Sequence, residues 1–453
     1  MALDPKAFKA YDVRGIYPSE LDEAGAYAVG RGYVEQFEPK AVAIGRDMRA
    51  SSPSIARAVM QGAADGGAQV KDIGMIGTEM LYFGVGELDL DGGVMVTASH
   101  NPKEYTGMKI VRRGALPVGG DSGLLDVRDR AQKIESPELD GDPSAESVDI
   151  YPAFVERVLS FIDAGAVAPL RVVIDAGNGM AGAMLPPILE RLPVDAVRCF
   201  FEPDGTFPNH EPNPLLPENR EFIVGKVKEE RADLGIAFDG DADRCFFVDD
   251  TGEFVPGDFV TALLAESMLE KEPGAKVIYD VRASWAVPHV VEQHDGTPLV
   301  NRVGHAFIKE RMRKEGALFG GEVSGHYYFR DFNQADSGTI PALLMMELVS
   351  KRGKPLSELL RPFREHYFIT GELNTPVPDV ALKLQELKEH FAGEGEISHL
   401  DGISVTAKDW HLNVRPSNTE PLLRLNLEAL APDLMERKRD EALAVIRGEG
   451  LVS

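Results

Sequence analysis

Three stretches of the chain share one pattern of hydrophobic and polar positions: an apolar run, a polar loop, and a segment whose apolar residues recur with helical spacing. They are AVAIGRDMRASSPSIARAVMQGAADGG from Ala41, RVVIDAGNGMAGAMLPPILERL from Arg171 and KVIYDVRASWAVPHVVEQ from Lys276. Unbroken apolar runs are typical of strands buried on both faces of a mainly parallel sheet covered by helices. The pattern therefore predicts three α/β domains in series, although single strand–loop–helix units occur in many large α/β proteins.

The last part of the chain has a different pattern. Strand-like runs occur in LNTPVPD, DGISVTAKDW and HLNVRPSNTEPLLRLNLEAL, and the helical segment PDLMERKRDEALAVIRG follows them. Strands with helices on one side indicate a smaller α+β domain. At 453 residues the chain is also too long for one ordinary core. We predict four domains, over residues 1–147, 148–250, 251–365 and 366–453.

Composition and charge narrow the classes of partner. Hydrophobic residues make up 43% of the chain and charged residues 27%, as in soluble globular proteins. The formal net charge of -25 repels nucleic acid and anionic membrane surfaces, so we expect neither as a partner. A small anionic substrate would need a local cluster of cations. The two cysteines form no CxxC pair, and no stretch resembles a signal peptide or a membrane span, so we expect a cytoplasmic protein.

The segment GGVMVTASHNPKEYTGMKI is the first that can carry chemistry. Its apolar strand runs directly into Ser99 and His100. A serine hydroxyl is a weak nucleophile and needs a neighbouring base, a metal or prior phosphorylation. His100 and Lys109 could supply positive charge around it. Taken alone, the segment is equally compatible with a polar turn held by serine and asparagine side chains.

Three alternating aspartates, Asp239, Asp241 and Asp243, follow the apolar run LGIAF and precede CFFV. In an extended segment alternate side chains point the same way, so we expect the three carboxylates to converge. Such crowding requires a cation, and Mg²⁺ prefers oxygen ligands. A solvated acidic turn is the alternative, but the flanking apolar runs place the charges at a sheet edge.

The segment GGEVSGHYYF carries Glu322, Ser324 and His326 at alternate positions, which in an extended loop would share one face. A carboxylate, a hydroxyl and an imidazole suit the hydroxyls of a sugar ring. An ordinary half-exposed strand is the alternative.

The segment HLNVRPSNTEPLLRL places Arg415 and the polar residues after it between two strand-like runs. Arginine can bind a phosphate with two hydrogen bonds, and loop amides and hydroxyls supply further donors. A plain hairpin turn is the alternative. Together with Arg14, Lys109, Arg244 and Arg282, Arg415 would form the cation cluster that an acidic protein needs for a phosphosugar.

These segments together resemble the α-D-phosphohexomutase superfamily, closest to bacterial phosphomannomutase/phosphoglucomutase. TASHNP is similar to its phosphoserine loop, DGDADR to its metal loop, GEVSGH to its sugar-recognition loop and RPSNTEP to its phosphate-binding loop. They occur in the family's order, one per domain, and the resemblance covers essentially the whole chain. It implies three tandem α/β domains with mixed sheets and a smaller C-terminal α+β domain, in a heart shape around a central cleft.

The resemblance also implies an activity: an isomerase that interconverts hexose 1-phosphate and hexose 6-phosphate, of mannose, glucose or both. The reaction would pass through a phosphoserine and a hexose 1,6-bisphosphate, which also serves as activator. The implied cofactor is Mg²⁺, the implied partner is a small phosphosugar, and a monomer is plausible.

Residue roles carry over by matching position. The implied metal ligands are Ser99, Asp239, Asp241 and Asp243. The implied catalytic residues are Ser99, His100, Lys109, Arg14 and His305, with His305 and Lys109 as candidates for proton transfer. The implied substrate-binding residues are Tyr11, Arg244, Arg282, Gly304, His305, Glu322, Val323, Ser324, Gly325, His326, Arg415, Pro416, Ser417, Asn418 and Thr419. Close relatives tend to carry lysine at the position of Arg282, and the two cations differ in shape and hydrogen bonding.

Three other functions share part of this pattern. A phosphoglucosamine mutase has the same serine and metal loops. Comparing turnover on glucose, mannose and glucosamine 1-phosphates would distinguish it. A catalytically silent sugar-phosphate-binding protein needs neither Ser99 nor the aspartates. A metal-dependent phosphatase would release inorganic phosphate, which a mutase should not.

Overall fold

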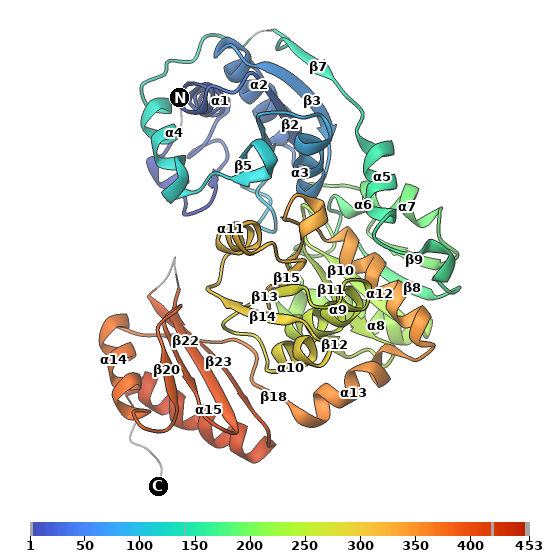
Figure 1. Ribbon diagram of the computed structural model, residues 1–453. Helices are drawn as coiled ribbons and strands as arrows, with labels where there is room; N and C mark the ends of the chain where they lie inside the picture. Colours follow the sequence, from blue (N-terminus) through green and yellow to red (C-terminus); the bar gives the residue numbers. More distant parts are fainter. Residues whose placement is uncertain (1–2, 140, 418–420, 449–453) are drawn as a thin grey trace. The chain divides into compact units, whose positions relative to one another are not determined.

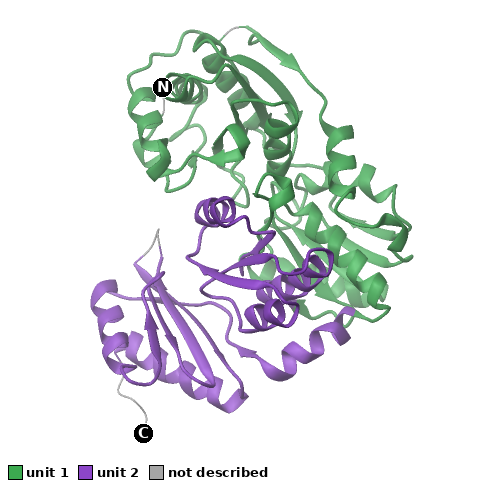
Figure 2. Cartoon of the chain, in the orientation of Figure 1, with its two compact units in different colours: residues 1–254, 324–355 green, residues 255–323, 356–453 purple. Residues whose placement is uncertain are grey.

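The computed structural model describes residues 3–139, 141–417 and 421–448 (Figure 1). The chain forms two compact units (Figure 2). Unit 1 comprises Met1–Phe254 with Ser324–Pro355, and unit 2 comprises Val255–Val323 with Leu356–Ser453. The chain first passes from unit 1 to unit 2 within the short strand β12 (Phe254–Val255).

The N-terminal part of unit 1 contains a mixed sheet with the strand order β1–β5–β4–β2–β3–β7. The central strand β2 pairs in parallel with β3 and β4, whereas β5 pairs antiparallel with β1, β4 and β6. The strands are β1 (Val13–Ile16), β2 (Ala41–Arg46), β3 (Gln69–Met75), β4 (Gly92–Val96), β5 (Tyr105–Arg112), β6 (Leu116–Pro117) and β7 (Ala145–Ser147). The helices are α1 (Glu23–Phe37), α2 (Ser52–Asp65), α3 (Thr78–Glu87) and α4 (Leu124–Ala131).

Helices α1 and α2 cross at two glycines. A Cβ atom on Gly62 would lie 2.1 Å from the Tyr27 carbonyl oxygen, and one on Gly30 would lie 2.4 Å from the Val59 carbonyl oxygen. Only glycine allows the two backbones to approach this closely.

The second sheet of unit 1 contains the parallel strands β9, β8 and β10 and the antiparallel strand β11. Their bounds are β8 (Arg171–Asp175), β9 (Asp195–Cys199), β10 (Leu234–Phe238) and β11 (Cys245–Asp249). Every residue of β10 and β11 is buried, as their apolar runs predict. The helices are α5 (Tyr151–Leu159), α6 (Ala181–Met184), α7 (Pro186–Leu189) and α8 (Glu221–Glu230). Unit 1 also includes β16 (Tyr327–Phe329), β17 (Ala335–Asp336) and α12 (Thr339–Arg352).

Both cysteines of the chain lie in this second sheet of unit 1. Cys199 is the last residue of β9 and Cys245 the first of β11, and both side chains are buried free thiols. Burial raises the pKa of Cys199 to about 11. Burial also raises the pKa of Cys245 well above its ordinary value. Both groups are therefore held as neutral thiols.

Unit 2 begins with α9 (Gly257–Lys271) and the parallel strands β13 (Lys276–Asp280), β14 (Thr297–Asn301) and β15 (Phe319–Gly321), with β13 in the middle. Helices α10 (Ala286–Gln293) and α11 (His305–Glu315) connect these strands. Helix α13 (Leu356–His366) leads into the C-terminal sheet.

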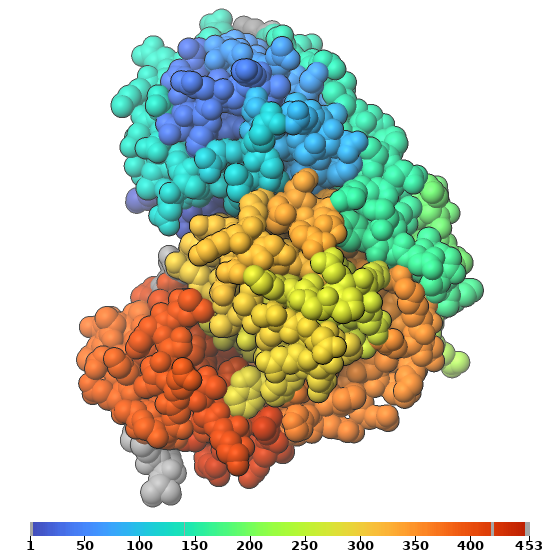
Figure 3. All heavy atoms as spheres, viewed as in Figure 1, coloured from blue at the N-terminus to red at the C-terminus, as the bar shows by residue number. Residues whose placement is uncertain are grey.

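The C-terminal sheet of unit 2 is antiparallel, with the order β18–β23–β22–β21–β20, and β19 also pairs with β23. The strands are β18 (Phe368–Ile369), β19 (Leu373–Pro376), β20 (Glu396–Ser398), β21 (Ile403–Thr406), β22 (Trp410–Pro416) and β23 (Leu422–Ala429). Helices α14 (Val380–His390) and α15 (Pro432–Arg447) accompany it, and the red C-terminal residues pack as one continuous body (Figure 3). Leu423, Leu425 and Leu427 alternate into the core with the two-residue period of a strand.

The predicted fold class is confirmed, with three α/β domains, mixed sheets and a C-terminal α+β domain. The three strand–loop–helix stretches are β2 with α2, β8 with α6 and α7, and β13 with α10. The four domain boundaries stay predictions. None of the helices in the described residues combines the length and apolar character that a membrane crossing requires.

Candidate active site

Ser99 lies in the loop that follows β4, in a conformation that non-glycine residues rarely adopt. Its φ angle is 51°, its side chain is buried, and its backbone N–H donates to Thr97 Oγ1 at 2.9 Å. Its Oγ lies 3.2 Å from Nδ1 of His100 and 3.2 Å from Oδ2 of Asp239. The hydroxyl is therefore held beside an imidazole and a carboxylate.

Arg49 fixes this serine loop, a role that the sequence analysis missed. The guanidinium is buried and donates to four backbone carbonyl oxygens, at 2.6–3.2 Å: those of Ser99, Asn101, Pro102 and Tyr105. Asp47 Oδ2 lies 3.3 Å from the Arg49 Nε and balances its charge. The signal was available in GRDMR, because polar residues at the carboxyl end of β2 lie at the edge where parallel sheets bind ligands.

The three aspartates converge, although in a tight turn and not in the extended segment that we predicted. Residues 239–244 connect the antiparallel strands β10 and β11, and Ala242 has a φ of 60°. One carboxylate oxygen from each of Asp239, Asp241 and Asp243 lies within 4.8 Å of the others, and all three residues are buried. The hairpin turn, and not strand alternation, brings the carboxylates together.

The metal loop and the serine loop are in close contact. A Cβ atom on Gly240 would lie 2.5 Å from the Ser99 carbonyl oxygen, so the turn passes directly against the serine backbone. Thr78, at the start of α3, holds the same turn: its hydroxyl donates to Asp241 Oδ2 at 2.5 Å and its N–H to the Asp241 carbonyl at 3.0 Å. Thr78 could not be predicted as part of this site, because it lies 163 residues from Asp241 along the chain.

Lys109 and Arg244 neutralise part of the acidic charge. Lys109 Nζ donates to Asp241 Oδ2 at 2.7 Å and to Asp243 Oδ2 at 2.5 Å. Arg244 Nε donates to Asp239 Oδ2 at 2.8 Å, and Arg244 Nη2 forms an ion pair with the same oxygen at 2.7 Å. Burial lowers the pKa of Lys109, but the two carboxylates outweigh it and hold the ammonium charged. Burial raises the pKa of Asp241, and Lys109 outweighs burial, so the net pKa is lowered. Burial and the Asp241 charge together raise the pKa of Asp243 well above its ordinary value.

The donor set fits a divalent cation that prefers oxygen ligands. Oδ1 of Asp241 and Oδ1 of Asp243 are buried and accept no hydrogen bond from any described residue. A buried carboxylate oxygen without a partner is costly, and a cation would satisfy it. Three carboxylates and the neighbouring serine oxygen leave coordination positions for water or a phosphate oxygen.

Arg14 borders the serine loop, and His100 is part of it. Arg14 donates to the Asn101 side chain and to Asp12, so its guanidinium borders the loop. Burial, reinforced by the positive charges of Arg244 and Arg14, lowers the pKa of His100 well below its ordinary value. Tyr11 is half buried, two residues before β1.

The sugar-recognition segment is a turn and not the extended loop that we predicted, because Gly325 has a φ of 85° and its Cβ position would meet the Phe246 ring at 2.7 Å. In unit 1, Ser324 Oγ lies 3.1 Å from Nδ1 of His326, whose Nε2 lies 3.8 Å from Asp243 Oδ1. His326 is thus next to the aspartates. The border between the two units falls between Val323 and Ser324.

In unit 2, Glu322 accepts a hydrogen bond from the Gly304 N–H at 3.0 Å. Gly304 has a φ of 127° and directly precedes α11, which begins at His305. The Val323 N–H donates to Asp280 Oδ2 at 3.0 Å. Glu322, Gly304 and His305 are therefore together at the N-terminus of α11.

The phosphate-loop segment forms the hairpin between β22 and β23. Arg415 is buried and is the direct cross-strand partner of Arg424, which the sequence analysis did not single out. Pro416 ends β22 and Ser417 follows it, whereas Asn418 and Thr419 lie outside the described residues. Arg282 is paired with both oxygens of Asp280, at 2.9 and 2.8 Å.

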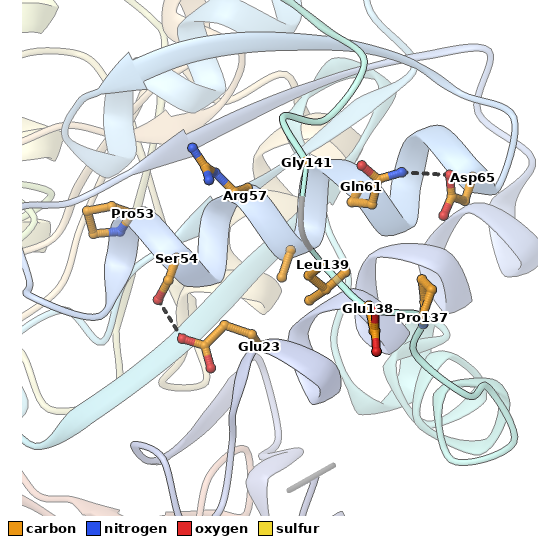
Figure 4. A pocket seen from close by; sticks show the side chains of 11 residues that line it. Glu23, Pro53, Ser54, Arg57, Gln61, Asp65, Pro137, Glu138, Leu139 and Gly141 are labelled. Carbon is orange, nitrogen blue, oxygen red and sulfur yellow. Dashed lines mark hydrogen bonds between the residues drawn. The ribbon is translucent and has the colours of Figure 1, made fainter.

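A separate cavity of about 620 Å³ lies between α1, α2 and the segment around Leu139 (Figure 4). Polar side chains that line it form hydrogen bonds with each other: the Ser54 hydroxyl donates to Glu23 at 2.7 Å, and the Gln61 amide donates to Asp65 at 2.8 Å. None of the predicted site residues lines it.

Four family models match successive parts of the chain and together cover most of it. They are phosphoglucomutase/phosphomannomutase alpha/beta/alpha domain I over residues 5–137, domain II over 152–252, domain III over 256–367 and the C-terminal domain over 372–445. The chain belongs to the phosphoglucomutase/phosphomannomutase family. The predicted superfamily and the predicted enzyme class, a mutase and thus an isomerase, are confirmed.

Individual relatives match over nearly their full length. A phosphomannomutase of Salmonella montevideo is 45% identical over 448 residues, which is 97% of this chain and 98% of the relative. A protein of Xanthomonas campestris pv. campestris named phosphohexose mutases is 45% identical over 446 residues, 98% and 99% of the two chains. A crystal structure of a phosphoglucomutase/phosphomannomutase family protein from Burkholderia thailandensis superposes with a TM-score of 0.89, at 32% identity and 99% coverage of both chains.

Proposed function

We propose that this mutase interconverts the 1-phosphate and 6-phosphate of mannose, glucose or both through a phosphorylated Ser99. One observation carries the proposal: the Ser99 hydroxyl lies 3.2 Å from Asp239, one of three converging aspartates. A phosphoryl donor and a cation site in direct contact are the two parts that phosphoryl transfer requires. The names of the two relatives support mannose phosphate and hexose phosphates more generally as substrates.

Asp239, Asp241 and Asp243, with an oxygen on Ser99, would hold Mg²⁺. When bound, Mg²⁺ would neutralise charge on the transferring phosphoryl group. Lys109 and Arg14 add positive charge beside the serine loop, whereas His100, which burial and the neighbouring cations keep neutral, places a ring nitrogen 3.2 Å from the Ser99 oxygen. Phosphoryl transfer requires little covalent chemistry from the protein. These residues would therefore act mainly by positioning the reacting groups and by neutralising their charge.

In the proposed reaction, the bond from phosphorus to the Ser99 oxygen breaks as phosphorus bonds to the free sugar hydroxyl. The hydroxyl proton passes to a base, and the leaving Ser99 oxygen takes up a proton. Of the two candidates for proton transfer, His305 is the candidate base, because Asp241 and Asp243 hold Lys109 as a charged ammonium that can only donate. The resulting hexose 1,6-bisphosphate turns around and returns its other phosphoryl group to Ser99. Phosphate and charge balance over the cycle, so no other reactant is needed.

The remaining predicted residues would bind the substrate. Glu322, Val323, Ser324, Gly325 and His326 would hold the sugar hydroxyls, together with Gly304. The non-reacting phosphate would be held by Arg415, Pro416, Ser417, Asn418 and Thr419. Tyr11, Arg244 and Arg282 complete the proposed set, although Arg244 and Arg282 already form ion pairs with Asp239 and Asp280. Reorientation requires such a site because each phosphate must bind at both positions in turn.

Ser99→Ala tests the phosphoserine. We expect the variant to lose at least about 99% of turnover, since it cannot carry the phosphoryl group, and to remain folded. Intact-mass analysis of the wild-type protein should show one phosphate that peptide mapping assigns to Ser99. Ser160→Ala, at an exposed serine of the same unit, is the matched control and should keep full activity. Normal turnover in Ser99→Ala would refute the proposal.

Turnover on mannose, glucose and glucosamine 1-phosphates would identify the preferred sugar and separate a phosphoglucosamine mutase. Inorganic phosphate released per turnover separates the mutase from a phosphatase, and we expect very little. We further propose that the protein acts in the cytoplasm as a monomer.

A further inference from the structure

Glu372 lies between three arginines of unit 2. Its Oε1 accepts from Arg424 Nη1 at 2.7 Å, and its Oε2 lies 3.4 Å from Arg415 Nη2 and 3.5 Å from Arg282 Nη1. Burial raises the pKa of Glu372, but the three guanidinium charges outweigh burial and lower the net pKa. Glu372 is therefore an ionised carboxylate in a cluster of cations.

The sheet dictates this arrangement. Arg415 on β22 and Arg424 on β23 are direct cross-strand partners, and β19 begins at Leu373, which pairs with Leu425. Two like charges directly opposite each other in a sheet repel and destabilise the pair. Glu372, one residue before β19, supplies the negative charge that holds the two guanidinium groups side by side.

The Arg415–Arg424 pair keeps hydrogen-bond donors that Glu372 does not use. Nε of Arg415 and Nε of Arg424 are both buried and donate to no described residue. Arg415 is 8% exposed, so its unused donor cannot be satisfied by bulk water. Arg282 differs, since Asp280 already neutralises it through two hydrogen bonds. An anion that reached the Arg415–Arg424 pair would satisfy these donors and would share the pair with Glu372.

We propose that Glu372 is an internal counter-anion of the phosphate site, which positions the Arg415–Arg424 pair and lowers its affinity for phosphate. This inference rests on the proposed function, in which the non-reacting phosphate binds at Arg415. A site that released phosphate too slowly would trap the bisphosphate, which must turn around in every cycle. Glu372 thus keeps the pair ordered between substrates while keeping phosphate exchange fast.

Glu372→Gln tests the inference, because it keeps the shape and one acceptor oxygen but removes the charge. We expect inorganic phosphate to bind the variant about tenfold more tightly, since a neighbouring negative charge in a partly buried site no longer repels the anion. Binding would be measured by titration calorimetry on the full chain at fixed ionic strength. With hexose phosphate we expect KM and kcat to fall together.

Glu315→Gln is the matched control. Glu315 lies in the same unit, is similarly half buried and forms a 2.9 Å ion pair with Lys276, outside the arginine cluster. We expect its phosphate affinity to equal that of the wild type. A purely structural role for Glu372 would instead weaken phosphate binding in Glu372→Gln, because the pair would lose its order. Unchanged or weaker binding in the folded variant overturns the proposal.

Glu372→Asp is a second variant that can still contradict the proposal if Glu372→Gln fails to fold. Because the charge remains, we expect phosphate affinity within about twofold of the wild type. A tenfold loss would show that the contact itself, and not the charge, matters, and would also overturn the proposal. Both variants are judged by binding alone, so an inactive wild-type enzyme would refute the proposed function without affecting this result.

Discussion

At the scale of single residues, two side chains outside the predicted site hold its reactive groups. Arg49 donates hydrogen bonds to four carbonyl groups of the serine loop, and the Thr78 hydroxyl orients the Asp241 carboxylate by donating to it. Residues that orient metal ligands commonly change metal affinity when they are replaced. The geometry of the aspartate cluster therefore depends on residues outside it.

Replacing Thr78 by valine should weaken Mg²⁺ binding. Valine keeps the shape of threonine but cannot donate to Asp241, so we expect the Mg²⁺ dissociation constant to rise about tenfold. Calorimetric titration with Mg²⁺ measures it. Thr206→Val, at an exposed threonine of the same unit, is the control. Equal Mg²⁺ affinity in the wild type and Thr78→Val would exclude this role.

Gly240→Ala should destabilise the protein and reduce activity. The new methyl group would lie 2.5 Å from the Ser99 carbonyl oxygen, so the metal and serine loops would have to separate. We expect a loss of about 1–3 kcal/mol in the free energy of unfolding. Gly225→Ala is a sharp control, because that glycine lies in α8 with open space around it, and alanine there should stabilise by about 0.5–1 kcal/mol. Urea unfolding compares the two variants, and equal stabilities would contradict the prediction.

At the scale of secondary-structure elements, the first turn of α3 connects two parts of unit 1. Thr78 bonds to the metal loop, and the adjacent Glu79 accepts hydrogen bonds from Ser337 and from the N–H and hydroxyl of Thr339, at the start of α12. Glu79 is fully buried, and burial raises its pKa to about 8 despite these hydrogen bonds. The Glu79 carboxyl group at the N-terminus of α3 is therefore mainly protonated at neutral pH.

Glu79 makes stability depend on pH. Its pKa is about 8 in the folded protein against an ordinary value of 4.5, so between these values the folded state binds more protons than the unfolded state. The free energy of unfolding should therefore fall as pH rises from about 4.5 to 8. In Glu79→Gln the part of this decrease in the free energy of unfolding that Glu79 causes should disappear. Urea unfolding at several pH values measures it, and parallel pH profiles for the two proteins would be the contrary result.

Elements and local motifs were predictable from the sequence, whereas several turns and long-range contacts were not. The apolar runs of β2, β8 and β13 predicted their strands because both faces are buried. The turn at Asp239–Asp243 was missed because the alternating aspartates suggested extended backbone, although the predicted convergence holds. Arg49 and Thr78 were missed because their partners lie 50 or more residues away along the chain.

At the scale of the whole molecule, the proposed site residues divide between the two units. Ser99, the aspartates and His326 belong to unit 1, whereas Arg282, Glu322 and Arg415 belong to unit 2. The residues of the proposed cation site thus belong to unit 1, and those of the proposed phosphate site belong to unit 2. The proposed function assigns the cation to unit 1 and the non-reacting phosphate to unit 2.

Hydrogen exchange should resolve these two sites. A ligand that binds only the folded state adds RT ln(1 + [L]/Kd) to its stability, which slows exchange nearby. We expect Mg²⁺ to protect the turn between β10 and β11, and inorganic phosphate to protect β22 and β23. Asp239→Asn should abolish the Mg²⁺ effect and leave the phosphate effect. Unchanged exchange of β22 and β23 in phosphate would count against the proposed phosphate site.

The two buried thiols of unit 1 make the chain convenient for site-specific labelling. Cys199 and Cys245 are buried and protonated, so maleimide dyes should not react with them under native conditions. An engineered surface cysteine in unit 2 would then be the preferred attachment point without removing either native one. Conversely, slow alkylation of the native pair would report each opening of the sheet that contains β9 and β11.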